Sequence, residues 1–137
     1  MKKLLIGISL ALAIVICLCM PYWVDDFACA KYHTEIEDLV SSVDGIKVTD
    51  SFSYCGNLHN GNHTSKIVVV LVETELTITE LTEKFSDAVE IAPFSDLSKW
   101  DEAFKRFSEQ VAENENNNYV ITYSQSAPFY YLDFRGH

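Results

Sequence analysis

The chain has 137 residues, of which 48% are hydrophobic and 22% charged; this composition fits one modest globular domain and excludes wholesale disorder or a collagen-like repeat. Its 10 basic and 20 acidic residues give a formal net charge of −10 at pH 7. Such an acidic chain lacks the positive surface with which proteins hold DNA, RNA or anionic lipid, so no nucleic-acid partner is expected.

The first 24 residues are predicted to form an N-terminal membrane anchor or a signal sequence. Leu4–Val24 is a run of 21 residues without a charge, about 30 Å long as a helix, which matches the hydrocarbon core of a bilayer. Lys2 and Lys3 precede this run, and Asp25 and Asp26 follow it. The positive-inside rule therefore places the N-terminus in the cytoplasm and the C-terminal domain outside.

Two fates of this segment stay open. An uncleaved single-pass anchor is favoured by the length of the apolar run, because signal-peptide cores are shorter, roughly 7–15 residues. Secretion after signal cleavage is the alternative, because Ala28-Cys29-Ala30 has the small-x-small form that signal peptidase prefers. In both cases residues 25–137 are predicted to form one extracytoplasmic domain, which carries a formal charge of −12 when uncleaved.

A short amphipathic helix is predicted directly after the apolar run. Thr34-x-x-Glu37 has the form of a capping box, in which each side chain accepts a hydrogen bond from the other residue's backbone N–H. Four apolar residues then recur at helical spacing: Ile36, Leu39, Val40 and Val43. Gly45 suits the position just after the helix, where the backbone often turns left-handed.

A β-hairpin with a long polar tip is predicted next. Alternating apolar residues from Ile46 to Tyr54 indicate a strand with one buried face. Ile67–Val72 is continuously apolar and mostly β-branched, which is typical of a strand that is covered on both faces or sits centrally in its sheet. The stretch Gly56–Asn62 between them is rich in turn-forming glycine and asparagine.

Two further helices are predicted between residues 77 and 111. Thr77-x-x-Glu80 is a second capping box and predicts a helix start. Pro93 is expected to end this helix. The apolar face of this helix consists of Ile78, Leu81, Phe85, Ala88 and Val89. The next helix, capped by Ser95 or Asp96, has an apolar stripe of Trp100, Ala103, Phe104, Phe107 and Val111.

A closing hairpin of Tyr119–Tyr123 and Phe129–Phe134 is predicted to complete the domain, with Ser124–Pro128 as its turn. Strands joined by short connections are antiparallel. After the membrane segment the expected order is therefore α-β-β-α-α-β-β. We expect an α+β fold in which a four-stranded antiparallel sheet is packed by two or three helices.

Three residues around the first hairpin tip have ligand chemistry. Cys55, His59 and His63 are spaced as Cys-x3-His-x3-His, and thiolate and imidazole are good ligands for zinc or copper. This pattern predicts a metal-binding or metal-sensing domain, although a structural zinc site needs a fourth ligand. The alternative is a solvated hairpin tip without a cofactor.

A disulfide between Cys29 and Cys55 competes with that metal site, because it removes the thiolate. These are the two cysteines outside the apolar run, and an oxidising compartment favours their pairing. Cleavage after Ala30 would discard Cys29 and leave Cys55 unpaired, which exported proteins seldom tolerate.

No Gly-x-Ser-x-Gly, His-Glu-x-x-His or phosphate-binding glycine loop occurs in the chain, so a non-catalytic domain is expected and an enzyme of unknown type is the minor alternative. Aromatic side chains gather in the last predicted strand: Phe129, Tyr130, Tyr131 and Phe134. Exposed aromatics suit binding of a protein or peptide. The leading hypothesis is therefore a membrane-tethered or secreted domain that binds a protein or peptide partner.

Overall fold

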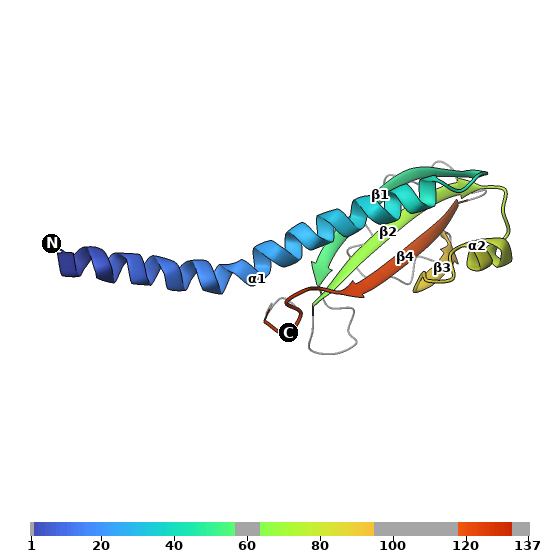
Figure 1. Cartoon of the computed structure of the whole chain (residues 1–137). Helices are drawn as coiled ribbons and strands as arrows, with labels where there is room; N and C mark the ends of the chain where they lie inside the picture. The colour runs from blue at the N-terminus through green and yellow to red at the C-terminus, as the bar shows by residue number, and fades with distance from the viewer. Residues whose placement is uncertain (1, 57–63, 95–117, 133–137) are drawn as a thin grey trace.

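A four-stranded antiparallel sheet with one long and one short helix forms the part of the chain that the computed structural model describes, residues 2–56, 64–94 and 118–132 (Figure 1). The elements in chain order are α1 (Lys2–Ser41), β1 (Ile46–Gly56), β2 (Ser65–Thr74), α2 (Ile78–Lys84), β3 (Glu90–Pro93) and β4 (Asn118–Ser126). The strands lie in the order β1-β2-β4-β3, and every neighbouring pair is antiparallel. The predicted α+β fold with a four-stranded antiparallel sheet is confirmed at this level.

The apolar segment and the short helix predicted after it are one continuous helix, α1, of 40 residues. The expected helix start at Thr34 is wrong. The Thr34 hydroxyl donates to the Ala30 carbonyl oxygen one turn earlier (3.4 Å), and Glu37 accepts a hydrogen bond from the Ser51 hydroxyl (2.9 Å). Both residues thus lie inside one continuous helix, so the Thr-x-x-Glu spacing does not mark a helix start here.

Gly45 directs the chain from α1 into the sheet, as predicted. Its φ of 84° lies in the left-handed region that side chains with a Cβ disfavour. The hydroxyl of Thr74 donates to the Gly45 carbonyl oxygen at 2.6 Å, which fastens this turn to the end of β2. The start of β1 is therefore fixed directly beside the end of its partner strand.

The predicted first hairpin is confirmed, with β1 paired to β2 from Ile46 opposite Thr74 to Gly56 opposite Ser65. β2 then pairs on its other edge with β4, so it has a strand on each side. Its apolar residues from Ile67 to Val72 are at most 1% exposed. The central, doubly covered strand expected from the continuous apolar run is therefore present.

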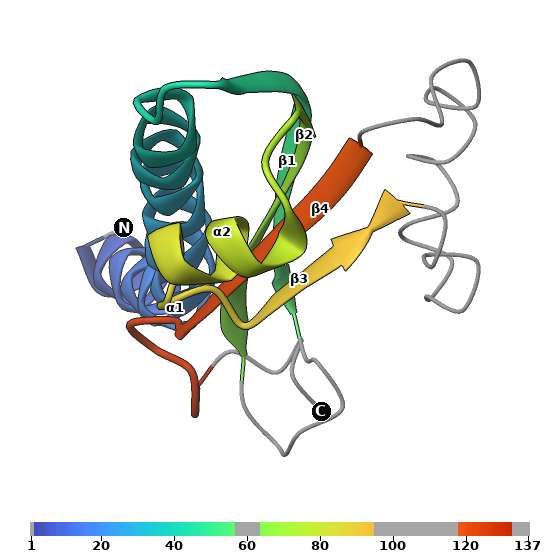
Figure 2. The ribbon, with the colours of Figure 1, turned by 90° about the vertical axis from the view of Figure 1, so that its right-hand side faces the viewer.

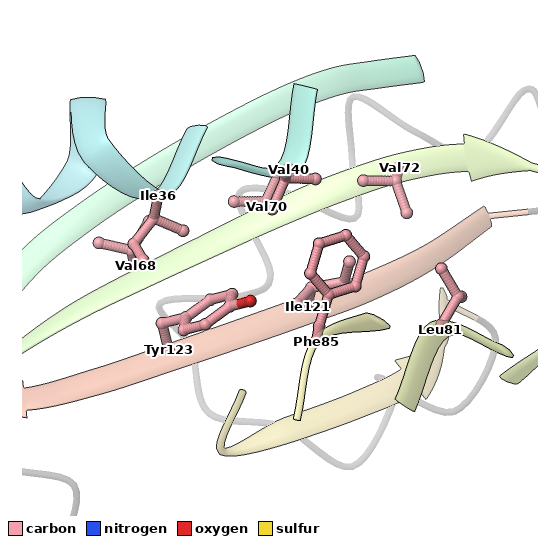
Figure 3. Close-up of a cluster of buried hydrophobic side chains, with 9 residues drawn as sticks. All are labelled: Ile36, Val40, Val68, Val70, Val72, Leu81, Phe85, Ile121 and Tyr123. Atoms are coloured by element: carbon pink, nitrogen blue, oxygen red, sulfur yellow. The ribbon is translucent and has the colours of Figure 1, made fainter. Parts of the chain in front are cut away.

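Both helices pack on one face of the sheet, as Figure 2 shows. Val68 faces Tyr123 and Val70 faces Ile121 across the β2–β4 pair, so these side chains form a continuous apolar floor. The cluster on this face consists of Ile36, Val40, Val68, Val70, Val72, Leu81, Phe85, Ile121 and Tyr123 (Figure 3). The opposite face has its own buried cluster of Ile67, Val69, Leu71 and Val120.

The helix predicted from Ile78 to Val89 is shorter in the structure. Its capping box is confirmed, since the Thr77 side chain accepts from the Glu80 N–H and the Glu80 carboxylate accepts from the Thr77 N–H. The helix nevertheless ends at Lys84, and the Val89 N–H donates to the Thr122 carbonyl oxygen at 2.8 Å. Pairing with β4 thus replaces further helical hydrogen bonds, and the following residues become β3.

The fourth strand is β3 rather than the predicted 129–134 segment. β4 has β2 on one edge and, from Tyr119 to Thr122, β3 on the other, so the edge that a returning strand was expected to use is occupied there. Residues 128–132 form turns instead, in which the Tyr130 N–H donates to the Ala127 carbonyl oxygen (3.3 Å). The helix predicted over 95–111 is outside the described residues.

Candidate functional site

Asp25 joins three segments of the domain at the place where α1 begins to pack on the sheet. Its side chain is fully buried, and its Oδ1 accepts the backbone N–H of Phe129 at 2.9 Å. Its backbone carbonyl oxygen accepts a hydrogen bond from the Cys55 thiol at 3.2 Å. One residue of α1 therefore holds both the end of β1 and the turn that follows β4.

Cys29 and Cys55, the predicted disulfide pair, lie in contact beside Asp25. Cys29 is one helical turn after Asp25 on the sheet-facing side of α1 and is 4% exposed. Cys55 is the second-last residue of β1 and is half-buried. Their side chains are close enough for Cys55 to influence the pKa of Cys29, and no bond joins the two sulfurs. A helix and a strand that are far apart in sequence thus supply one thiol pair.

The Cys29 thiol is unusually acidic. The neighbouring Cys55 side chain is the largest influence on its pKa and lowers it, whereas burial raises it. Further hydrogen bonds from the Ser53 side chain and the Ile67 backbone lower the pKa, and the Asp26 charge raises it. The net result is a pKa of about 6, against an ordinary 9.0. The lowered pKa favours the thiolate of Cys29, the form that reacts with disulfides.

The aromatic segment after β4 forms a turn that is fastened to the domain. The Thr64 N–H donates to the Tyr130 carbonyl oxygen, and the Ala127 N–H donates to the Thr64 carbonyl oxygen, both at 3.1 Å. Tyr131 remains 69% exposed and Leu132 56% exposed. Of the predicted partner-binding residues, Phe129 and Tyr130 are thus half-buried and Tyr131 is exposed. Phe134 is beyond the last described residue.

A groove of about 440 Å³ lies between α1, α2 and β4. Tyr32, Tyr123 and Asp87 are among its lining residues. Burial, followed by the Asp87 charge and then Tyr32, raises the pKa of Tyr123 to about 12, and burial raises that of Tyr32 as well. Both phenols therefore keep their protons at neutral pH and offer O–H donors in the groove.

The metal hypothesis rests on residues that the structure largely leaves undescribed. Within residues 2–56, 64–94 and 118–132 no group of three His, Cys, Asp or Glu side chains is placed to hold a metal ion. His59 and His63 fall in the gap between β1 and β2, so their convergence with Cys55 stays a prediction. His33, a histidine in the described part of the chain, hydrogen-bonds Ser51 at 2.7 Å.

The role of Asp25 was missed by sequence reasoning, although a signal for it exists. The buried stripe of α1 contains Ile36 and Val40. Continued backwards in steps of three or four residues, this stripe passes through Cys29 and Asp25. An acidic residue on that stripe indicates a buried carboxylate with hydrogen-bond donors nearby.

Comparison with known proteins gives no assignment, since no family model, no curated protein and no solved structure matches the chain. The function is therefore inferred from the residues and contacts described above.

Proposed function

We propose that the chain is a membrane-tethered domain that stands outside the cytoplasm and binds another protein. One observation carries the tether: the first half of α1 projects from the sheet as an apolar rod (Figure 1). Its large apolar side chains from Leu4 to Leu18 are 48–68% exposed. Only 6% of the most apolar 18-residue window is buried inside the protein, which supports a membrane helix over a core helix. A signal sequence has the same length and composition, and the fractionation described below separates it from an anchor.

The packed part of α1 defines where the lipid-exposed part stops. Pro21 and Asp25 are buried against the domain, which leaves Leu4–Met20 as the free apolar stretch. These seventeen residues make a helix of about 26 Å, close to the shortest that spans a bilayer core. Trp23 is 62% exposed and Phe27 74% exposed just beyond it, where an interfacial aromatic belt is expected. We therefore place the outer edge of the hydrocarbon core near Met20.

The charges flanking α1 support an outward-facing domain. Lys2 and Lys3 precede the apolar stretch, whereas the residues from Asp25 onwards carry a formal charge of −12. Positive residues are retained on the cytoplasmic side of a membrane helix. The acidic domain is also repelled by the anionic inner leaflet.

The exposed aromatic turn is the surface that we assign to a protein partner. Tyr131 and Leu132 are exposed, yet hydrogen bonds to Thr64 and Asp25 hold the backbone of their turn. A fixed aromatic surface binds with little loss of conformational freedom. Asp25 is five residues, about 8 Å along the helix, past Met20, so the turn lies near the membrane surface. The charge of the domain favours a partner at that surface with a basic face.

Intact mass combined with fractionation tests the tether. Membranes and the soluble exported fraction are collected from cells that express the full chain, and the protein in each is weighed. We expect full-length mass in salt-washed membranes, with the domain digested by protease added from outside. A soluble species trimmed after Ala30, or protection of the domain in intact cells, contradicts the proposal.

Site-specific photocrosslinking tests the partner. A photoreactive amino acid replaces Tyr131 in one sample and Thr82, an exposed residue on α2, in a matched control. We expect one protein crosslinked from position 131 alone, with a basic surface at the membrane and a yield that falls as salt rises. Crosslinking of position 131 to lipid, or equally from both positions, contradicts a protein partner at this turn.

A further inference from the structure

We propose that Cys29 and Cys55 form a reversible disulfide that locks the anchor helix to the sheet, acquired by exchange with a disulfide-bearing oxidant outside the cytoplasm. The location of the oxidant rests on the proposed function; the pairing itself does not. The inference starts from the contact between the two thiols at the point where α1 meets β1.

The backbone around both thiols is fixed by contacts that do not involve a sulfur–sulfur bond. The Asp25 side chain is buried and bonded to Phe129, which sets the rotation of this turn of α1. Cys55 stands opposite Lys66 in the regular β1–β2 ladder, which sets the position of the strand. Its sulfur lies 3.2 Å from the Asp25 carbonyl oxygen, one helical turn before Cys29. The contacts that set the two elements thus also bring the two side chains toward each other, as a disulfide between them requires.

The two thiols differ in a way that suits sequential exchange. Cys55 is half-buried and Cys29 is 4% exposed, so Cys55 is the more accessible of the two thiols. Cys55 loses its proton to water, and its sulfur attacks the oxidant's disulfide. This step forms a mixed disulfide and releases one oxidant thiolate, which takes up a proton. The Cys29 thiolate then attacks the Cys55 sulfur and expels the second oxidant thiolate. In sum, two protein thiols and one oxidant disulfide become one protein disulfide and two oxidant thiols.

Hydrogen bonds favour the second of these steps. A resolving thiol reacts as its thiolate. The hydrogen bonds from the Ser53 side chain and the Ile67 backbone lower the pKa of Cys29, and both remain when Cys55 is in the mixed disulfide. These two contacts favour the Cys29 thiolate that displaces the oxidant. The mixed disulfide on Cys55 should be short-lived for that reason.

The bond would act as a latch at the membrane boundary. It closes the chain between residues 29 and 55, which contains the packed half of α1 and most of β1. Asp25, which holds the partner-binding turn through Phe129, is one helical turn away. The oxidised chain therefore keeps the anchor, the sheet and that turn in one arrangement, and reduction leaves only non-covalent contacts.

Thiol counting on the full-length chain in detergent tests the pairing itself. Cys17 and Cys19 are both replaced by alanine so that two thiols remain. The reduced protein is exposed to glutathione disulfide, quenched with a maleimide and weighed. We expect an intramolecular product two hydrogen atoms lighter with no maleimide attached. Ser53→Ala should slow closure at pH 7 without preventing it, because it removes one of the hydrogen bonds to Cys29.

Three outcomes overturn the proposal: two maleimides per chain after oxidation, a stable glutathione adduct on Cys55, or a disulfide between two chains. Cys29→Ser and Cys55→Ser each leave one thiol and should give the stable adduct or no reaction. These controls show the product expected from a chain that cannot form the internal disulfide. The same count is then made on protein taken directly from cells. If glutathione disulfide closes the bond in detergent but protein from cells has two open thiols, the pairing stands and the placement of the domain outside the cytoplasm is contradicted. Failure of the pairing and failure of the proposed function are therefore distinguishable.

Discussion

The two halves of α1 share one continuous backbone but differ in what covers them. From Leu4 to Leu18 apolar side chains surround the helix and all large ones are at least 48% exposed. From Cys29 to Val40 the buried residues, Cys29, Ile36 and Val40, are one or two helical turns apart and lie on one side only. The first half of the helix thus has apolar side chains on all sides, and we assign their surroundings to lipid. The second half is buried along one stripe only, which packs on the sheet. The two halves should therefore respond oppositely to the same substitution.

The largest effect is expected from a charge in the packed half. Val40→Asp places a carboxylate at a side chain that is 0% exposed, so it should cost on the order of 4 kcal/mol of unfolding free energy. Leu39→Asp, one residue earlier and 47% exposed, should cost less than about 1 kcal/mol. Denaturant unfolding of the full chain in detergent measures both. Equal losses from the two variants would mean that this half is not packed on the sheet.

A charge in the exposed half should act on the membrane instead. Leu12→Asp should weaken insertion by about 3 kcal/mol, because an aspartate at the centre of a membrane helix is costly. The unfolding free energy of the sheet domain should stay unchanged, since Leu12 is 59% exposed and touches no core residue of the described clusters. The fraction retained in carbonate-washed membranes reports insertion, with Leu39→Asp as the variant that should be fully retained.

The junction between the halves should show a pH dependence in the reduced chain. The pKa of Cys29 is about 6 folded and 9.0 as the ordinary value, so between these values the unfolded state binds a proton that the folded state does not. The stability of the reduced chain should therefore rise as the pH increases from 6 to 9, and it should lose this contribution as the pH falls through 6. Thermal unfolding across this range should show the rise, and Cys29→Ala should abolish it. A flat profile in the reduced wild type would show that Cys29 has no lowered pKa.

The smallest effect is expected outside α1, at the start of α2. Thr77→Ala removes the side chain that accepts the Glu80 N–H, and loss of such a cap costs about 1 kcal/mol. Thr82→Ala is the matched control, because its hydroxyl bonds a carbonyl within the same helix and caps nothing. Membrane retention should be unaffected in both variants. Similar unfolding free energies for the two would contradict the capping box.

Patterns that depend on local chemistry were predictable from the sequence. Gly45, the capping box at Thr77 and the doubly buried run Ile67–Val72 each follow from backbone sterics, hydrogen bonding or burial within a few residues. For Cys29 and Cys55 the sequence predicted a pairing, but not where in the fold the two residues meet. Their contact depends on how α1 is rotated over β1, and this rotation is fixed by distant residues such as Phe129.

The failed predictions share a different cause, which is competition from partners that are remote in sequence. The Thr34-x-x-Glu37 spacing is compatible with a helix start and with a helix interior. In the structure it lies in the interior, because α1 is continuous from Lys2 to Ser41. β3 has four residues, too few for periodicity to reveal, and it took the β4 edge that the 129–134 segment was expected to use. Asp25 read as a charge that marks the end of a membrane span, whereas its carboxylate is buried.

Spin labels along α1, in the full chain reconstituted in vesicles, test most directly whether one helix joins the membrane to the sheet. Labels are placed singly at Ile8, Leu12 and Ile16, and then at Phe27 and Thr34. The account predicts collisions with oxygen but not with a water-soluble nickel complex at the first three positions, and the reverse at Thr34. Phe27 should be intermediate. Nickel access at all five positions, or a native chain that begins after Ala30, would contradict it.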